Sequence, residues 1–208
     1  MKKMLWLWLG LMAASFSQAA EERTFLLATA GEVDAALVEH TRAYMELNSG
    51  AAVALAPAIP VEPGQSLESI GRAAAKTLGK NGHSIIVLAA ADTGQPQGVC
   101  LPQLRFAVLN LARLGEKVDE AKLERRTGQE ALRVMSMLLD MAPCPFPLCV
   151  LVGYEKTEDL DQMSGNFCPP CQTRFLRLAQ EAGLRLVEGA PEAAAAEVAP
   201  EAEPAAAE

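Results

Sequence analysis

Apolar runs alternate with helically spaced segments through the first half of the chain. Residues 23–30, 51–61 and 83–92 are short apolar stretches without polar alternation, which is typical of strands buried on both faces. Between them, residues 31–50 and 66–82 carry apolar side chains at helical spacing and end at glycine. Strands that alternate with helices predict an α/β fold, a single compact domain with a mixed, mostly parallel sheet and helices on its faces.

The second half of the chain begins with strands and continues with helices. Residues 98–114 predict one or two further strands, with Pro102 marking an edge or a bulge. Residues 119–141 have a helical pattern with a broad apolar surface, and a capping-box spacing within them predicts a break near Gly128. A last amphipathic helix is expected over residues 173–187.

Composition divides the chain into three segments. Residues 1–20 contain two lysines, an apolar run from Met4 to Ser17 and small residues at the end, which is the layout of a signal peptide. An uncleaved membrane anchor is the alternative, but the run is short for a span of about 20 residues. Residues 188–208 are almost entirely Ala, Glu and Pro and predict a disordered acidic tail. Residues 21–187 are enough for one domain. We expect this domain to be exported to the periplasm or outside the cell, and to be free of the membrane once the signal peptide is cleaved.

The charge of the chain narrows the classes of partner. The net charge is −8 at pH 7. An acidic protein does not attract nucleic acid or an anionic membrane surface, so we expect neither as a partner. The chain also has no phosphate-binding loop, dinucleotide fingerprint or G-x-S-x-G elbow, which are common signatures of nucleotide-binding proteins and serine hydrolases.

Four of the five cysteines fall into two pairs. Cys144 and Cys149 are separated by four residues and Cys168 and Cys171 by two, each pair in a proline-rich turn. Paired turns of this kind suit a tetrahedral zinc ion held by four thiolates in a closed structural site. Two other interpretations stay open on spacing alone: two structural disulfides, which suit an exported protein, and thiol–disulfide exchange by Cys168 and Cys171 at a helix start. Cys100 stands apart and is expected to be a small buried side chain.

The order of these features resembles the archaemetzincins, a family of metzincin-type zinc proteases with an α/β fold. The resemblance covers residues 98–175 and rests on the phrase LNLARL at residues 109–114, the helix that contains QEALRVM, and the two cysteine pairs. It implies a metzincin-like domain that ends in a four-cysteine knuckle holding one structural zinc ion. In the family, a second, catalytic zinc is bound by three histidines of an HExxHxxGxxH motif on this helix, and the glutamate of the motif is the general base.

The helix of this chain departs from the family motif at every catalytic position. With Glu130 in register with the start of the family pattern, Arg133 and Met137 fall on the first two histidines, Val134 on the glutamate and Pro143 on the third histidine. The alignment implies that no catalytic zinc and no catalytic residue remain. It also implies that Arg133 must find a carboxylate or point into the former cleft.

The histidines of the chain do not replace the missing ligands. His40 and His83 lie on a different predicted helix and strand, and neither belongs to a metal-binding motif. The sequence therefore predicts an exported pseudoprotease without the catalytic His and Glu residues. A retained cleft is expected to bind a peptide or protein segment along an edge strand near residues 104–109. The alternative is a redox protein or a disulfide-stabilised envelope protein that uses Cys168 and Cys171.

Overall fold

The computed structural model describes residues 22–188. The predicted signal peptide, residues 1–20, lies outside the described residues, as does all of the predicted tail except Glu188. Among residues 22–188, no helix has both the length and the apolar character needed to span a membrane.

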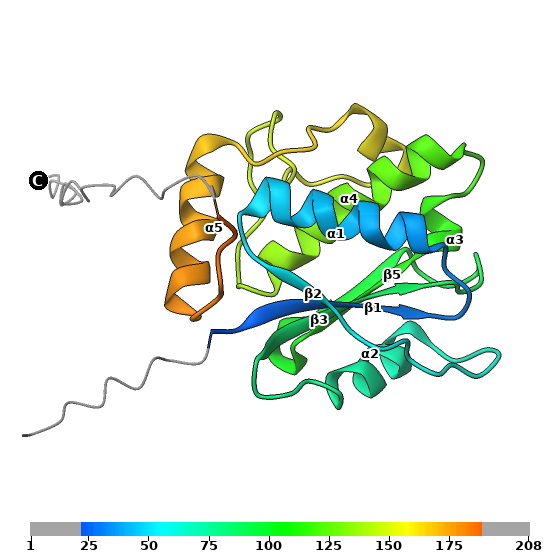
Figure 1. Cartoon of the computed structure of the whole chain (residues 1–208). Coiled ribbons are helices and arrows are strands. Elements are labelled where there is room, and N and C mark those ends of the chain that lie inside the picture. The colour runs from blue at the N-terminus through cyan, green and yellow to red at the C-terminus, as the bar shows by residue number, and fades with distance from the viewer. Residues whose placement is uncertain (1–21, 189–208) are drawn as a thin grey trace, which may run out of the picture.

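A five-stranded sheet forms the centre of the domain (Figure 1). Its strands are β1 (Thr24–Ala30), β2 (Val53–Leu55), β3 (Gly82–Ala89), β4 (Gly98–Leu101) and β5 (Phe106–Asn110). They lie in the order β2-β1-β3-β5-β4, with β4 antiparallel to β5 and every other neighbouring pair parallel. The mixed, mostly parallel sheet that the sequence predicts is confirmed.

Helices cover both faces of this sheet. They are α1 (Ala35–Ser49), α2 (Leu67–Ala75), α3 (Leu111–Leu114), α4 (Glu120–Met137) and α5 (Pro169–Glu181). Two 3-10 turns complete the fold, η1 (Pro102–Leu104) between β4 and β5 and η2 (Thr157–Gln162) between α4 and α5. In Figure 1, α1 and α4 lie above the sheet and α2 lies below it. The larger hydrophobic core is on the side of α1 and α4 and the smaller one on the side of α2. This two-sided burial explains why the central strands are apolar without alternation.

The helix α4 is continuous, so the predicted break near Gly128 is wrong. Asp119 caps its N-terminus through its side chain. Gly128 lies inside the helix against α1, where a Cβ atom would come 2.9 Å from the Tyr44 ring. The glycine therefore permits close packing of two helices and does not end one. The two side chains with capping-box spacing, Thr127 and Glu130, are both buried within α4.

The edge strands of the sheet are β2 and β4, and β4 lies next to β5, so the predicted edge near residues 104–109 is wrong. The strand β5 lies between β3 and β4, and all of its residues are buried. Pro102 begins η1, and Arg105 adopts a left-handed conformation with φ of 61°. This turn reverses the chain and places β4 outside β5. The free backbone edge at this end of the sheet therefore belongs to Gly98–Leu101.

Three elements are shorter than the apolar or helical segments that predict them, and one of these is α2, which ends at Ala75 and not near residue 82. The strand β2 ends at Leu55, and Pro57 follows it without an N–H group to continue the ladder. The helix α5 ends at Glu181, because Gly183 turns the chain with φ of 68°. Leu184 then forms an isolated bridge beside the start of β1.

Candidate functional site

Four cysteines converge beside the start of α5. Their Sγ atoms all lie within 4.8 Å of one another, and those of Cys144 and Cys168 are 3.8 Å apart. Cys144 and Cys149 belong to the loop after α4, Cys168 is the N-cap of α5, and Cys171 lies in the first turn of that helix. The structure therefore brings together all four residues that the sequence assigns to a metal knuckle.

Backbone N–H groups point at the sulfur atoms of this cysteine cluster. Phe146 N–H donates to Cys144 Sγ (3.4 Å), and Cys168 N–H donates to Cys149 Sγ (3.5 Å). Burial raises the pKa of the Cys149 and Cys171 thiols. For Cys168 burial acts in the same direction, but hydrogen bonds from the Cys171 backbone and from the neighbouring thiols outweigh it and lower the pKa. The cluster thus favours a thiolate at Cys168, the form in which cysteine binds a metal.

The spacing of the sulfur atoms fits one tetrahedral metal ion. A zinc–sulfur distance of about 2.3 Å places the sulfurs of a tetrahedral site about 3.8 Å apart, which matches the separation of Cys144 and Cys168. A disulfide needs sulfur atoms about 2.05 Å apart, whereas all five cysteines of the chain, which fall within the described residues, are free thiols. Four soft donors at this spacing can hold a zinc ion with no position left for a substrate.

A cleft lies between the edge strand β4 and the helix α4. It consists of two adjoining pockets of about 400 and 380 Å³ that share Arg133 and Met137. We call the first the strand pocket, because Gly98 and Cys100 of β4 line it together with α4. We call the second the apolar pocket; its lining includes Pro102, Met141, Pro143 and Leu151. The cleft contains all four positions at which the sequence departs from the family motif.

Arg133 joins α4 to the loop that follows the first cysteine pair. Its Nε lies 3.0 Å from a carboxylate oxygen of Glu130, one turn earlier on the helix. Its Nη1 donates hydrogen bonds to the carbonyl oxygens of Val150 (2.5 Å) and Val152 (2.7 Å), and its guanidinium carbon lies 4.8 Å from the centre of the Tyr154 ring. The expectation that Arg133 finds a carboxylate is therefore confirmed. This side chain holds the wall of the cleft in place.

A second polar network continues from Glu130 along the strand pocket. Burial raises the pKa of Glu130, against the opposing effects of Arg133 and Tyr154. Burial also raises the pKa of Tyr154, whose hydroxyl accepts a hydrogen bond from Gln97 (2.5 Å). Gln97 in turn accepts a hydrogen bond from Thr157 (2.5 Å). Sequence reasoning missed Gln97, Tyr154 and Thr157, because Gln97 lies about 60 residues before the other two and none of the three belongs to a motif.

The other substituted positions differ in exposure. Val134 is buried, whereas Met137 is 41% exposed at the junction of the two pockets. Pro143 is exposed at the rim of the apolar pocket. Val134 thus packs into the core, whereas Met137 faces the cleft. The correspondence of these positions to the zinc ligands of the family stays a prediction.

Neither histidine of the chain lines the cleft. His40 lies on α1 and stacks on Tyr44. His83 lies near the start of β3, and burial together with Arg105 and Arg23 lowers its pKa to about 4. The chain contains two histidines in all. It therefore cannot supply the three-histidine set of a metzincin zinc site.

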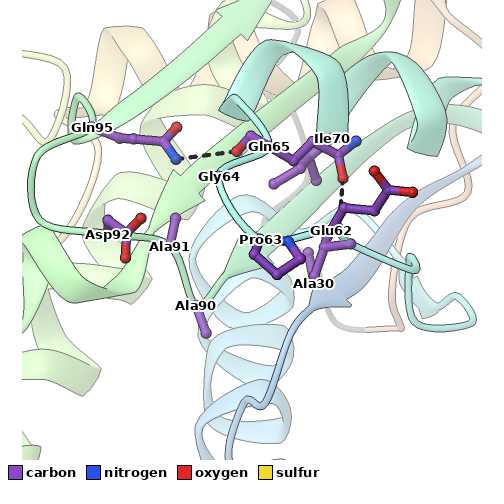
Figure 2. Close-up of a pocket in the computed structure, with 11 residues that line it drawn as sticks. Ala30, Glu62, Pro63, Gly64, Gln65, Ile70, Ala90, Ala91, Asp92 and Gln95 are labelled. Atoms are coloured by element: carbon purple, nitrogen blue, oxygen red, sulfur yellow. Dashed lines mark hydrogen bonds between the residues drawn. The ribbon is translucent and has the colours of Figure 1, made fainter.

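A third pocket of about 300 Å³ lies at the carboxyl ends of β1 and β3 (Figure 2). Gln95 donates a hydrogen bond to the Gln65 carbonyl across its mouth (3.1 Å), which joins the loops that follow β2 and β3. Glu62 and Asp92 line it, and both are exposed. Because Asp92 follows β3 and His83 is near its start, these two residues lie at opposite ends of the strand and form no joint site.

Solved structures with the same architecture are archaemetzincins and a related peptidase. The archaemetzincin of Methanopyrus kandleri matches with a TM-score of 0.64 and 16% identity, covering 76% of this chain and 96% of that one. The zinc-dependent peptidase of Methanocorpusculum labreanum matches with a TM-score of 0.60 and 16% identity, covering 73% and 99%. The archaemetzincin of Archaeoglobus fulgidus, solved with malonate, matches with a TM-score of 0.56 and 19% identity over the same shares.

Sequence comparison gives a weaker signal in the same direction. The archaemetzincin of Thermococcus kodakarensis is 28% identical over 85 residues, which are 38% of this chain and 46% of that protein. The match thus spans about half the length of that relative. No family model matches the chain. This chain has the fold of the archaemetzincins, with a four-cysteine cluster near its C-terminus that can bind a metal ion.

Proposed function

We propose that this protein is an exported archaemetzincin-like pseudoprotease. In this proposal one structural zinc ion, bound by the four-cysteine cluster, braces the loop beside α4, and the cleft binds peptide without cleaving it. The observation that carries the proposal is the content of the cleft. It holds an arginine, a valine and a methionine on α4 and no histidine among the described residues.

The cysteine cluster has a structural role in this proposal. A zinc ion there would be bound by Cys144, Cys149, Cys168 and Cys171 and would supply a cross-link between the end of α4 and the start of α5. Around it, Cys144 N–H donates to the Leu151 carbonyl (3.0 Å) and Val150 N–H donates to the Asn166 carbonyl (2.8 Å). These bonds hold the loop against the cluster, and the same loop supplies the carbonyls that Arg133 contacts.

The free edge of β4 supports peptide binding. Asn110 N–H donates to the Gln97 carbonyl (2.8 Å) just before β4. In an antiparallel pair this pattern repeats every two residues, so the N–H and C=O groups of Gly98 and Cys100 point away from β5. An extended peptide can hydrogen-bond to these groups as an added strand.

One set of measurements on the purified protein tests this proposal. Native mass spectrometry without added metal, followed by thiol counting after unfolding, is expected to find one zinc ion and five alkylatable cysteines. A peptide library is expected to yield binders with dissociation constants below about 1 mM, and the same peptides are expected to stay intact when zinc is added. Cleavage of these peptides by the pure protein would contradict the proposal, as would the absence of any binder.

The same measurements separate the competing function, thiol–disulfide exchange by Cys168 and Cys171. The lowered pKa of Cys168 at the start of α5 favours that chemistry if no metal binds there. Two disulfides, no metal and turnover in an insulin-reduction assay would support it. Fractionation of producing cells tests the export step, with the mature chain expected outside the cytoplasm and shortened by about 20 residues.

A further inference from the structure

Arg133 has an uncommitted donor group at the centre of the cleft. Its Nη1 is used by the carbonyls of Val150 and Val152, and its Nε faces Glu130. Within residues 22–188, its Nη2 has no hydrogen-bond partner, although Arg133 lines both the strand pocket and the apolar pocket. The stacking of the guanidinium on Tyr154 fixes its plane. A donor held this rigidly loses little conformational entropy when it binds an oxygen atom.

The charge around this donor favours an anionic oxygen. Of the described residues that line the two pockets, Arg133 is the single one with a cationic side chain. Glu130 opposes it from the buried side of the cleft, where its carboxylate lies 3.0 Å from Nε and leaves Nη2 without a partner among the described residues. The second acidic residue, Asp140, is exposed at the rim of the apolar pocket. The cleft of this acidic protein therefore contains one local site for a negative group.

The two pockets on either side of Arg133 differ in what they can bind. The strand pocket offers the backbone groups of Gly98 and Cys100, and glycine at residue 98 permits the close pairing of β4 with β5, where a Cβ atom would come 2.9 Å from the Val108 carbonyl oxygen. The apolar pocket offers Pro102, Met141 and Leu151 in a space of about 380 Å³, enough for one large apolar side chain. An extended chain on β4 thus reaches the guanidinium and the apolar pocket together.

We infer that the cleft captures the C-terminus of a peptide whose last residue is apolar. The α-carboxylate of the peptide binds Nη2 of Arg133, its last side chain enters the apolar pocket, and the preceding residues pair with β4. This inference rests on the proposed peptide-binding function and adds the chemical class of the ligand. It commits to a free peptide C-terminus, because the backbone of an internal peptide segment carries no charge to match Arg133, whereas the last residue carries a carboxylate and a side chain on one Cα atom.

Matched peptides test the inference on the unaltered protein. The probes are fluorescein-labelled octapeptides that end in leucine, prepared once with a free carboxylate and once as the carboxamide, and binding is measured by fluorescence anisotropy. We expect the free acid to bind at least about tenfold more tightly than the amide, since a charge-assisted hydrogen bond is lost. Equal affinities would overturn the inference and leave the proposed peptide binding standing. Failure of both peptides to bind would overturn both proposals.

Substitution of Arg133 then assigns the effect to one residue. Arg133→Gln is expected to bring the ratio of acid to amide affinity to within about twofold of one. The matched control is Arg72→Gln, which changes the net charge equally on the opposite face of the sheet, where Arg72 is exposed on α2. The control is expected to keep the tenfold ratio. Retention of that ratio by a folded Arg133→Gln protein, or its loss in the control, would contradict the assignment to Arg133. The comparison of acid and amide on the wild-type protein decides the inference even if the Arg133 variant does not fold.

Discussion

The cysteine cluster and the cleft both hold the loop at residues 150–166, the cluster from the two ends of the loop and the cleft through α4, and they do so with different chemistry. The cluster gathers four identical soft donors within 4.8 Å of one another. The cleft instead joins α4 to the loop through a guanidinium, two backbone carbonyls and an aromatic ring. A tetrahedral metal site needs all four of its ligands at once, whereas a side-chain network can lose or replace one contact at a time. We therefore expect the loss of one cysteine to abolish metal binding by the whole cluster. The loss of one contact in the cleft should weaken the cleft only in part.

Loss of one cluster cysteine is expected to have the largest effect. In Cys149→Ser the buried sulfur is replaced and the proposed zinc site loses one of its four ligands. We expect the protein to lose its metal and at least about 4 kcal/mol of unfolding free energy, because zinc binding is coupled to folding. Urea denaturation together with metal analysis measures both. The variant would refute the proposed zinc role if it kept wild-type stability.

The lone cysteine provides a control for this variant. Cys100 lies in β4, outside the cluster, and burial raises its pKa to about 11. Cys100→Ser is expected to keep a full complement of metal and to change the unfolding free energy by less than about 1 kcal/mol. A loss of metal in this control would mean that the cluster effect is not specific to the four cysteines.

The other end of the loop is held by a buried ion pair, and breaking it is expected to have the next largest effect. Arg126 of α4 is 2% exposed and makes two hydrogen bonds of 2.9 Å to Asp161 of η2. In Asp161→Asn the buried guanidinium loses its counter-charge, which costs about 3 kcal/mol of unfolding free energy. Glu158→Gln is the matched control, since Glu158 is exposed on the same turn. Similar destabilisation in both variants would contradict a specific role for the pair.

The same pair predicts a dependence on pH. Hydrogen bonds from Arg126 lower the pKa of Asp161 below its value in the unfolded chain, which is about 3.9. The stability that it contributes is therefore fully present above about pH 4 and is lost as the pH falls through the lowered value. The difference in unfolding free energy between the wild type and Asp161→Asn is expected to be constant from pH 5 to 7 and to shrink toward pH 3. A difference that grows on acidification would show that another group dominates.

Sequence reasoning found the cysteine cluster because its ligands are close in sequence. The pairs at Cys144 and Cys168 lie at short, regular spacings in proline-rich turns, and metal sites of this type leave that local signature. The strands and helices were also readable, because burial on both faces gives apolar runs without alternation. The order of the strands in the sheet could not be predicted from the sequence in the same way. Nothing in the apolar run of β5 says which strand pairs beside it, so the edge was assigned to the wrong segment.

The buried contacts of α4 could not be predicted from the sequence for a different reason. Arg126 and Glu130 are charged residues that are buried, and sequence patterns place such residues on the surface. Their partners come from the distant loop, as Asp161 and Tyr154 do, so no short spacing connects them. Gly128 shows the same limit, because its role is set by the Tyr44 ring of α1 and not by its neighbours in sequence.

The smallest expected effect tests whether the cluster and the cleft are coupled. Arg133 binds the carbonyls of Val150 and Val152, which follow Cys149 directly in sequence. Without these bonds the cysteine loop is less ordered in the metal-free protein. Zinc binding must then supply more of the free energy that orders the loop, and zinc affinity falls. In the double variant Arg133→Met and Glu130→Gln, which leaves no unpaired buried charge, we expect zinc affinity to fall by about tenfold, or about 1.4 kcal/mol. Competition with a chromogenic chelator measures this affinity without any peptide.

A control for the double variant comes from the exposed pair on α2. Arg72→Met with Glu68→Gln removes an exposed ion pair within one helix on the opposite side of the sheet, and its zinc affinity should match the wild type. If the Arg133 variant also matches the wild type, the two regions are independent, and the loop is ordered by the cluster alone. If its affinity falls as expected, reciprocity requires that zinc also strengthens the cleft by the same factor. Metal loading would then stabilise the wall of the cleft, although none of the four cysteines lines it.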